Sequence, residues 1–130
     1  MPKTTVVLYR EEDGSCPFRD WYGELPVKAQ AKCLLRLERL RELGHELRRP
    51  EADYLRDGIY ELRVRCQHVH FRILYFFHGT VAAVVSHGIV KEGAVPAKEI
   101  DRAIQRKKRF EADSDAQFQR RPEIERATQK

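Results

Sequence analysis

Two adjoining runs of alternating polar and apolar residues, at positions 55–77, constrain this chain more than any other feature. They read LRDGIYELRVRCQHVHFRILYFF and have the period of two that is typical of β-strands. Turn-forming residues precede the first run and separate it from the second, so we predict adjacent antiparallel strands at 59–66 and 69–77. One face of this hairpin would join a core through Tyr60, Leu62, Val64, Phe71, Ile73 and Tyr75.

The opposite face of the predicted hairpin is polar and mostly positive. It collects Glu61, Arg63, Arg65, His70 and Arg72. Like charges on facing strands repel, and such a surface is stabilised when an anion binds to it. Phosphate matches the planar guanidinium fork well, so the face predicts a protein that handles RNA. The alternative is a solvated sheet face on which Glu61 offsets part of the charge.

The strand register decides which side chains meet. With two-residue turns throughout, four facing pairs are predicted: Arg63 with Arg72, Arg65 with His70, Arg72 with Val85, and His70 with His87. Lys91 then lies on the same face as its strand ends, unless Gly88 marks a bulge.

The remaining sequence predicts an α+β domain. We expect a strand at 4–10, helices at 17–25 and 27–43, a polar loop at 45–53, strands at 59–66, 69–77 and 80–90, and a helix at 96–110. The order β-α-α-β-β-β-α favours an antiparallel sheet packed with two N-terminal helices and one C-terminal helix. Residues 1–110 would form this single domain, and the polar residues 111–130 a flexible tail.

The charge distribution points to an anionic partner. The net charge is +5, and residues 57–109 alone carry ten basic and five acidic side chains. A basic protein without a special partner can show the same excess. The sequence contains no apolar run long enough for a bilayer and no signal-peptide core, so we expect a cytoplasmic protein that does not engage membranes.

Other chemical sites find little support in the sequence. Cys66, His68 and His70 have no second ligand cluster near them in the sequence, so no metal site is predicted. Gly-rich phosphate loops and the HExxH and GxSxG motifs do not occur. We therefore expect neither a metal nor another cofactor. The three cysteines are widely spaced and do not suggest a disulfide framework.

The segment LRDGIYELRVR…HFRILYFF…VSHGIVKEGAVPAKEIDRAIQR resembles the HigB/RelE superfamily of bacterial type II toxins, especially its phage-derived HigB-like branch. The likeness covers about residues 55–106, and extends to the N-terminal strand and helices in layout only. It implies a RelE-like fold and a ribosome-dependent endonuclease that cleaves mRNA without a metal ion. It also implies three partners, namely the ribosome, mRNA and a cognate HigA-like antitoxin with a helix-turn-helix domain.

The resemblance carries three residues over to this chain. Arg63 matches the arginine of the Glu-Leu-Arg strand, Arg72 the arginine of the next strand, and Lys91 the first of a Lys-Lys pair. The chain departs from the family pattern at Glu92, where the second lysine is expected, and this removes a positive charge beside the site. Further departures are Ile89 in place of an aromatic residue and Val95 in place of a threonine N-cap.

The mechanistic hypothesis gives each polar residue a role. Arg63 and Arg72 clamp the phosphate, while Lys91 and His87 are acid–base candidates whose pKa values neighbouring arginines should depress. The other members of the face are Arg65 and His70, which would steer the RNA, and Glu61, which would orient an arginine or act as the base. Two alternatives remain, a non-catalytic RNA- or ribosome-binding module and a basic protein-interaction domain, with gyrase poisoning a distant third.

Overall fold

The computed structural model describes residues 3–113, which form a five-stranded mixed sheet with helices on both faces. Its strands are β1 (Thr5–Leu8), β2 (Ala52–Arg56), β3 (Ile59–Cys66), β4 (Val69–His78) and β5 (Ala82–Val90). Its helices are α1 (Pro17–Gly23), α2 (Val27–Leu43) and α3 (Ala97–Ala112), with a 3-10 turn, η1 (Gly44–Glu46), after α2. The predicted α+β class is confirmed.

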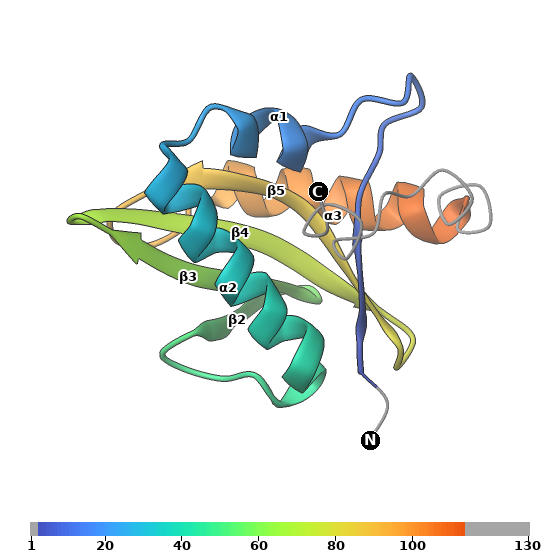
Figure 1. Ribbon diagram of the computed structural model, residues 1–130. Coiled ribbons are helices and arrows are strands. Elements are labelled where there is room, and N and C mark those ends of the chain that lie inside the picture. Colours follow the sequence, from blue (N-terminus) through green and yellow to red (C-terminus); the bar gives the residue numbers. More distant parts are fainter. Residues whose placement is uncertain (1–2, 114–130) are drawn as a thin grey trace.

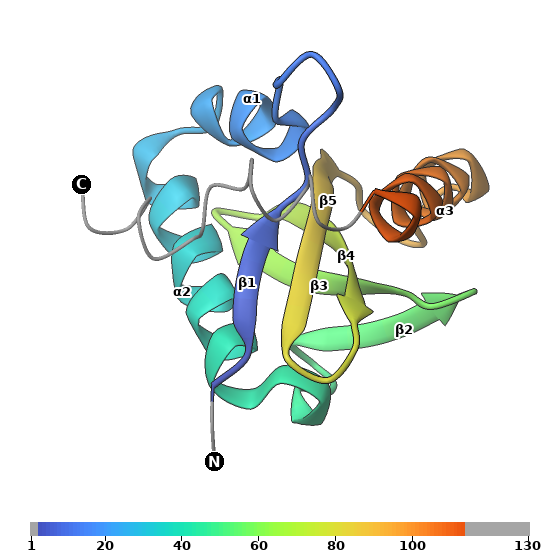
Figure 2. The ribbon, with the colours of Figure 1, turned by 90° about the vertical axis from the view of Figure 1, so that its right-hand side faces the viewer.

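The sheet separates two apolar layers. Helices α1 and α2 cover one face and α3 covers the other, as Figures 1 and 2 show from two directions. The alternation along β4 serves both layers, because Ile73 and Tyr75 join the core with α2 whereas Leu74 and Phe76 join the core with α3. The hairpin face that was predicted to be polar is therefore apolar where α3 lies on it and polar beyond.

The sheet departs from the predicted antiparallel arrangement at one edge. The strand order is β1-β5-β4-β3-β2, and β1 pairs with β5 in parallel. Strand β5 is buried on both faces along most of its length and lies inside the sheet. It therefore needs a neighbour on each side, and β1 is the strand that supplies the second one.

The second edge strand, β2, was not predicted. Residues 52 and 53 were assigned to a polar loop and residues 54–56 to no element, yet this segment pairs with β3 from Ala52↔Leu62 to Arg56↔Ile59. Only Ala52 of this strand is buried. An edge strand with one buried residue lacks the alternation by which strands are recognised, which explains the omission.

Helix boundaries agree closely with the sequence pattern. Helix α2 spans the predicted residues, from Val27 to Leu43, while α1 ends at Gly23 rather than at residue 25. Helix α3 begins after Pro96 and continues to Ala112, so the first two residues of the predicted tail are helical. The rest of that tail, from residue 114 on, lies outside the described residues.

The predicted register between β4 and β5 is wrong. The connecting loop is longer than two residues, so His78 pairs with Ala82 and Tyr75 with Val85. A bulge then shifts the register, so Arg72 lies opposite Ile89 instead of Val85, and His87 lies opposite Leu74 instead of His70. The longer loop shifts the register by an odd number of residues, which alone would place every β5 side chain on the opposite face of the sheet. The bulge shifts it by one more residue and so returns the side chains beyond it to the predicted face.

Candidate functional site

Two arginines face one another on the central strands, as predicted. Arg63 of β3 pairs with Arg72 of β4, and Arg65 pairs with His70, in a register that is confirmed along the whole β3–β4 ladder. The same face carries Leu74 and Phe76 where it packs against α3. The arginine pair therefore begins where the α3 core ends, on a sheet that apolar packing holds in place.

The pair lines an open cavity of about 540 Å³, which we call the arginine cavity. Its lining comes from α2, from the segment before β2, and from β3 and β4: Arg36, Pro50, Glu51, Arg63, Val64, Arg65, His70 and Arg72. Five of these eight side chains are arginine or histidine and one is acidic, so the cavity favours an anionic ligand.

Glu61 holds the two arginines side by side. The residue is 4% exposed, and its two carboxylate oxygens lie 2.9 Å from Nε of Arg63 and 3.1 Å from Nε of Arg72. A second carboxylate, of Asp53, lies 3.1 Å from Nη2 of Arg63, while Nη2 of Arg72 donates to the carbonyl of Gly93 at 3.2 Å. Both guanidinium groups are therefore oriented before any ligand arrives.

The cationic surface continues around the edge of β3. Pairing of β2 with β3 ends at Leu62, and the backbone N–H of Arg63 donates to the carbonyl of Glu51 at 2.8 Å. Beyond this point a neighbouring cavity of about 350 Å³ extends onto α2; it shares Arg36, Glu51, Val64 and Arg65 with the arginine cavity and adds Lys32, Leu35 and Arg39.

Glu51 moderates this positive charge. Its carboxylate forms ion pairs with Arg36 and, at 2.9 Å, with Arg39. The hydrogen bond from Arg39 is the main reason why the pKa of Glu51 lies below its ordinary value. Glu51 therefore remains charged at neutral pH and fixes the two α2 arginines at the rim of the cavity.

Lys91 lies beside the cavity at the end of β5. Its backbone N–H donates to the carbonyl of His70 at 3.0 Å, so the β4–β5 register continues and Lys91 stands opposite His70. Its side chain is exposed, as is that of Glu92. The predicted placement of Lys91 on the arginine face thus agrees with the structure, although the bulge lies before His87 and not at Gly88.

Gly88 does not mark a bulge, and its missing side chain makes room for α1 instead. It stands opposite Ile73, on the face that α1 covers, and a Cβ atom at this position would collide with the ring of Trp21. Trp21 also packs edge-on against Phe71, with ring centroids 6.0 Å apart. The missing side chain therefore lets α1 approach the sheet.

His87 is not part of the arginine cavity. It is buried beneath α3, where its Nε2 lies 3.0 Å from Oε1 of Glu99 and its Nδ1 lies 2.7 Å from the hydroxyl of Ser86. Burial is the main cause that lowers the pKa of His87 to about 4, followed by the positive charge of Arg106. The predicted lowering is present, but its causes are burial and an α3 arginine rather than the arginines of the sheet.

The buried state of His87 predicts how stability depends on pH. The imidazole takes up a proton at about 6.5 in the unfolded chain and at about 4 in the folded one, so stability is lost as the pH falls through this window. When the pH is lowered from 7 to 4, the melting temperature of His87→Gln should fall by fewer degrees than that of the wild type. The exposed His68→Gln variant should follow the wild type, and equal slopes for all three proteins would contradict this assignment.

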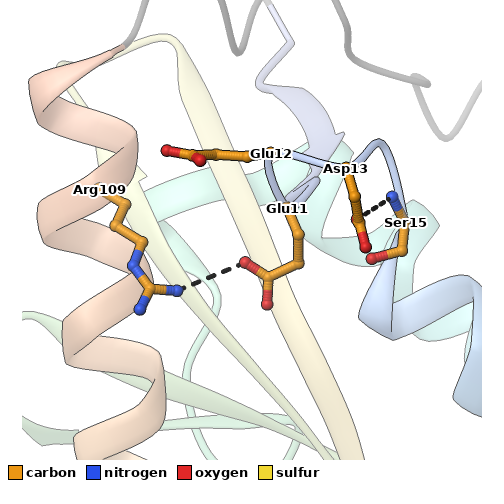
Figure 3. A pocket seen from close by; sticks show the side chains of 5 residues that line it. All are labelled: Glu11, Glu12, Asp13, Ser15 and Arg109. Carbon is orange, nitrogen blue, oxygen red and sulfur yellow. Dashed lines mark hydrogen bonds and ion pairs between the residues drawn. The ribbon is translucent and has the colours of Figure 1, made fainter.

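A separate cavity of about 600 Å³ has the opposite charge. It lies between the loop after β1 and α3, and Figure 3 shows its lining of Glu11, Glu12, Asp13, Ser15 and Arg109. Nη1 of Arg109 lies 3.4 Å from a carboxylate oxygen of Glu11, and the Ser15 N–H donates to Asp13 at 2.9 Å. Three carboxylates against one guanidinium disfavour an anion, so this cavity is unsuited to RNA.

Two further features concern classes of function. Between residues 3 and 113, no three His, Cys, Asp or Glu side chains gather where they could hold a metal ion. Over the same part of the chain, no helix has both the length and the apolar character needed to cross a membrane.

The sequence did not reveal the residues that complete the cavity from outside the hairpin. Asp53, Glu51 and Arg36 contribute through long-range contacts, and no local pattern marks them. The charge excess of residues 57–109 was the available signal, and it falls on β3, β4 and α3 rather than on these residues.

Fold and site together define a small α+β domain that presents paired arginines on a cationic sheet face. The model of the family described as phage-derived protein Gp49-like (DUF891) matches residues 20–108, well over half of the sequence. The chain therefore belongs to the Gp49-like family, which is associated with RelE/HigB-like toxins of toxin–antitoxin systems. A search of curated proteins found no match to this sequence.

Proposed function

We propose that this protein is the HigB-like toxin of a type II toxin–antitoxin system and acts as a ribosome-dependent mRNA endonuclease. One observation carries the proposal, namely that Arg63 and Arg72 face each other on neighbouring strands and both line an open cavity. Two preoriented guanidinium groups match the geometry of one phosphodiester and stabilise the charge that develops on it. Membership of the Gp49-like family supports the toxin class.

The proposed reaction uses the 2′-hydroxyl of the RNA as its nucleophile. The 2′-oxygen forms a bond to the adjacent phosphorus while the bond from phosphorus to the 5′-oxygen breaks. A base takes the proton of the 2′-hydroxyl, and an acid gives a proton to the leaving 5′-oxygen. The products are a 2′,3′-cyclic phosphate and a free 5′-hydroxyl, so neither water nor a metal ion enters the balance.

We assign proton transfer to residues that lie beside the arginine pair. His70 lines the cavity and Lys91 stands opposite it just after β5, so we assign the acid–base roles to these two residues. His87 is withdrawn from the proposal because its ring nitrogens are engaged by Ser86 and Glu99 beneath α3. Glu61 orients both arginines instead of serving as the base.

The remaining cationic residues would guide the RNA. Arg65 lines both the arginine cavity and its neighbour on α2, and the exposed Lys32 continues that surface. Contacts between these cationic side chains and the RNA backbone do not depend on the base sequence, which suits a substrate presented by the ribosome. The cognate partner is proposed to be a helix-turn-helix antitoxin, which would be encoded by a short adjacent reading frame.

Primer-extension mapping of transcripts tests the function. Induction of the toxin alone in a bacterial host should arrest growth and produce new mRNA ends inside coding regions, each carrying a 5′-hydroxyl. The ends should vanish when the start codon of the reporter transcript is removed, because the cleavage requires translation. Growth arrest without new ends would favour a non-catalytic ribosome-binding module, and cuts in an untranslated reporter would contradict ribosome dependence.

A further inference from the structure

A second cavity lies at the β2 edge on the sheet face that α2 covers, whereas Arg63 and Arg72 extend from the opposite face. It has a volume of about 460 Å³, and we call it the tyrosine cavity. Its lining combines two aromatic rings with two arginines and one carboxylate: Leu47, Arg48, Arg49, Ala52, Asp53, Tyr54 and Tyr60. Aromatic surface next to guanidinium groups is the composition with which proteins bind unpaired nucleotides.

The ring of Tyr54 is exposed yet fixed. It is 52% exposed, but its hydroxyl accepts a hydrogen bond from the N–H of Gly58 at 3.0 Å. Its ring also packs edge-on against Tyr60 at 5.0 Å between centroids, and Tyr60 in turn stacks on the buried Tyr75 at 5.4 Å. A ring held at both ends offers a flat apolar surface without a further loss of side-chain freedom on binding.

One carboxylate oxygen joins the two cavities. Oδ2 of Asp53 lies 2.9 Å from Nη2 of Arg49 and 3.1 Å from Nη2 of Arg63. Arg49 lines the tyrosine cavity and Arg63 the arginine cavity, so guanidinium groups of the two cavities are immediate neighbours. The side chain of Arg49 is 74% exposed and can reach a phosphate that lies between them.

We propose that the tyrosine cavity is a nucleobase subsite for single-stranded RNA. The RNA strand passes around the β2 edge of the sheet, where Arg49 contacts a phosphate, and a base beyond that phosphate stacks on Tyr54 on the opposite face. This inference rests on the proposed function, because it takes the phosphate at Arg63 and Arg72 as its starting point. Stacking on an aromatic ring accepts any base, which suits an enzyme whose targets differ in sequence.

The test uses a short RNA from which one base can be deleted. A fluorescently labelled hexaadenylate with 2′-O-methyl groups cannot be cleaved, and its affinity is measured by anisotropy at low salt. Deleting the base at the stacked position should weaken binding to the wild type by about tenfold. Tyr54→Ala should weaken binding to the intact RNA by a similar factor and add nothing when that base is already absent, whereas Tyr54→Phe should keep wild-type affinity.

The controls distinguish base stacking on Tyr54 from non-specific electrostatic binding. Val81→Ala changes an exposed residue in the β4–β5 loop and should bind like the wild type. Circular dichroism checks that each variant is folded. The subsite is overturned if the wild type does not bind the RNA, or if Tyr54→Ala binds intact RNA as tightly as the wild type. It is also overturned if Tyr54→Ala loses as much affinity for the base-deleted RNA as for the intact RNA, or if an acidic peptide of equal charge displaces the RNA equally well.

The same variants distinguish this inference from the proposed function. If Tyr54→Ala has no effect on binding while the wild type cuts translated mRNA, the subsite is wrong and the endonuclease stands. If binding depends on Tyr54 but the wild type makes no cuts, the subsite stands as part of an RNA-binding module and the endonuclease is wrong.

Discussion

Replacing Arg72 with alanine should lower the rate of mRNA cleavage by about a hundredfold to a thousandfold and relieve the growth arrest. Its side chain is only 12% exposed, and it is held by Glu61 and by the carbonyl of Gly93. A guanidinium group fixed in this way costs no reorganisation when the phosphate acquires charge. The measurement is quantitative primer extension at matched toxin levels, together with growth curves after induction.

Two further variants make this result specific. Arg72→Lys keeps the positive charge but loses the planar fork, so it should recover only part of the activity. Arg19→Ala removes an exposed arginine on α1, away from the cavity, and should cleave like the wild type. If Arg72→Ala cleaved mRNA at the wild-type rate, Arg72 would not clamp the phosphate, and the proposed reaction would lack its source of positive charge.

The arginine pair could be predicted because a hairpin with a two-residue turn has only one register. Positions 66 and 69 must pair across such a turn, and the pairing of Arg63 with Arg72 follows by counting. Gln67 and His68 adopt positive φ angles of 50° and 72°, as a turn that matches the twist of the strands requires. The most important feature of the site thus depends on local chemistry alone.

The position of His87 could not be predicted in the same way. Its register depends on a longer loop and on a bulge between Val85 and His87, neither of which has a marker in the sequence. The assumed two-residue loop and the missed bulge compensate for the face on which His87 lies, but not for the residue that faces it on β4. His87 therefore lies opposite Leu74 and under α3. Its burial is a tertiary effect that strand periodicity does not contain.

The segment from residue 47 to residue 53 was the larger omission. Polar composition suggested a loop, but the segment supplies Glu51 and Asp53, which pair with arginines of both cavities. Its position depends on the edge pairing of β2 with β3 and on the backbone hydrogen bond from Arg63 to Glu51, twelve residues away in the sequence. Such contacts leave no local pattern, and only the fold brings them to the site.

Acidic residues are as important to this site as basic ones. Glu61, Asp53 and Glu51 each contact two arginines, so each carboxylate is shared between two guanidinium groups, namely those of Arg63 and Arg72, of Arg49 and Arg63, and of Arg36 and Arg39. This arrangement lowers the repulsion that the free protein would otherwise carry. Because Glu61 is the most buried of the three, its loss should expose that repulsion most clearly.

Glu61→Gln should lower the free energy of unfolding by about 2–3 kcal/mol in a low-salt chloride buffer. The substitution leaves Arg63 and Arg72 adjacent, and only a neutral amide then lies between their Nε atoms. Inorganic phosphate should restore much of the lost stability, because an anion in the arginine cavity replaces the missing charge. Urea denaturation in chloride and in phosphate at equal ionic strength measures both effects.

Glu42→Gln is the matched control for this experiment. Glu42 forms an exposed ion pair with Lys3 at 3.1 Å, so its loss should change stability by less than about 1 kcal/mol. Phosphate also stabilises proteins in general, and the gain of Glu42→Gln in phosphate measures that background. A larger gain for Glu61→Gln than for Glu42→Gln would locate the bound anion at the arginine pair, whereas equal gains would mean that the cavity does not bind phosphate in the free protein.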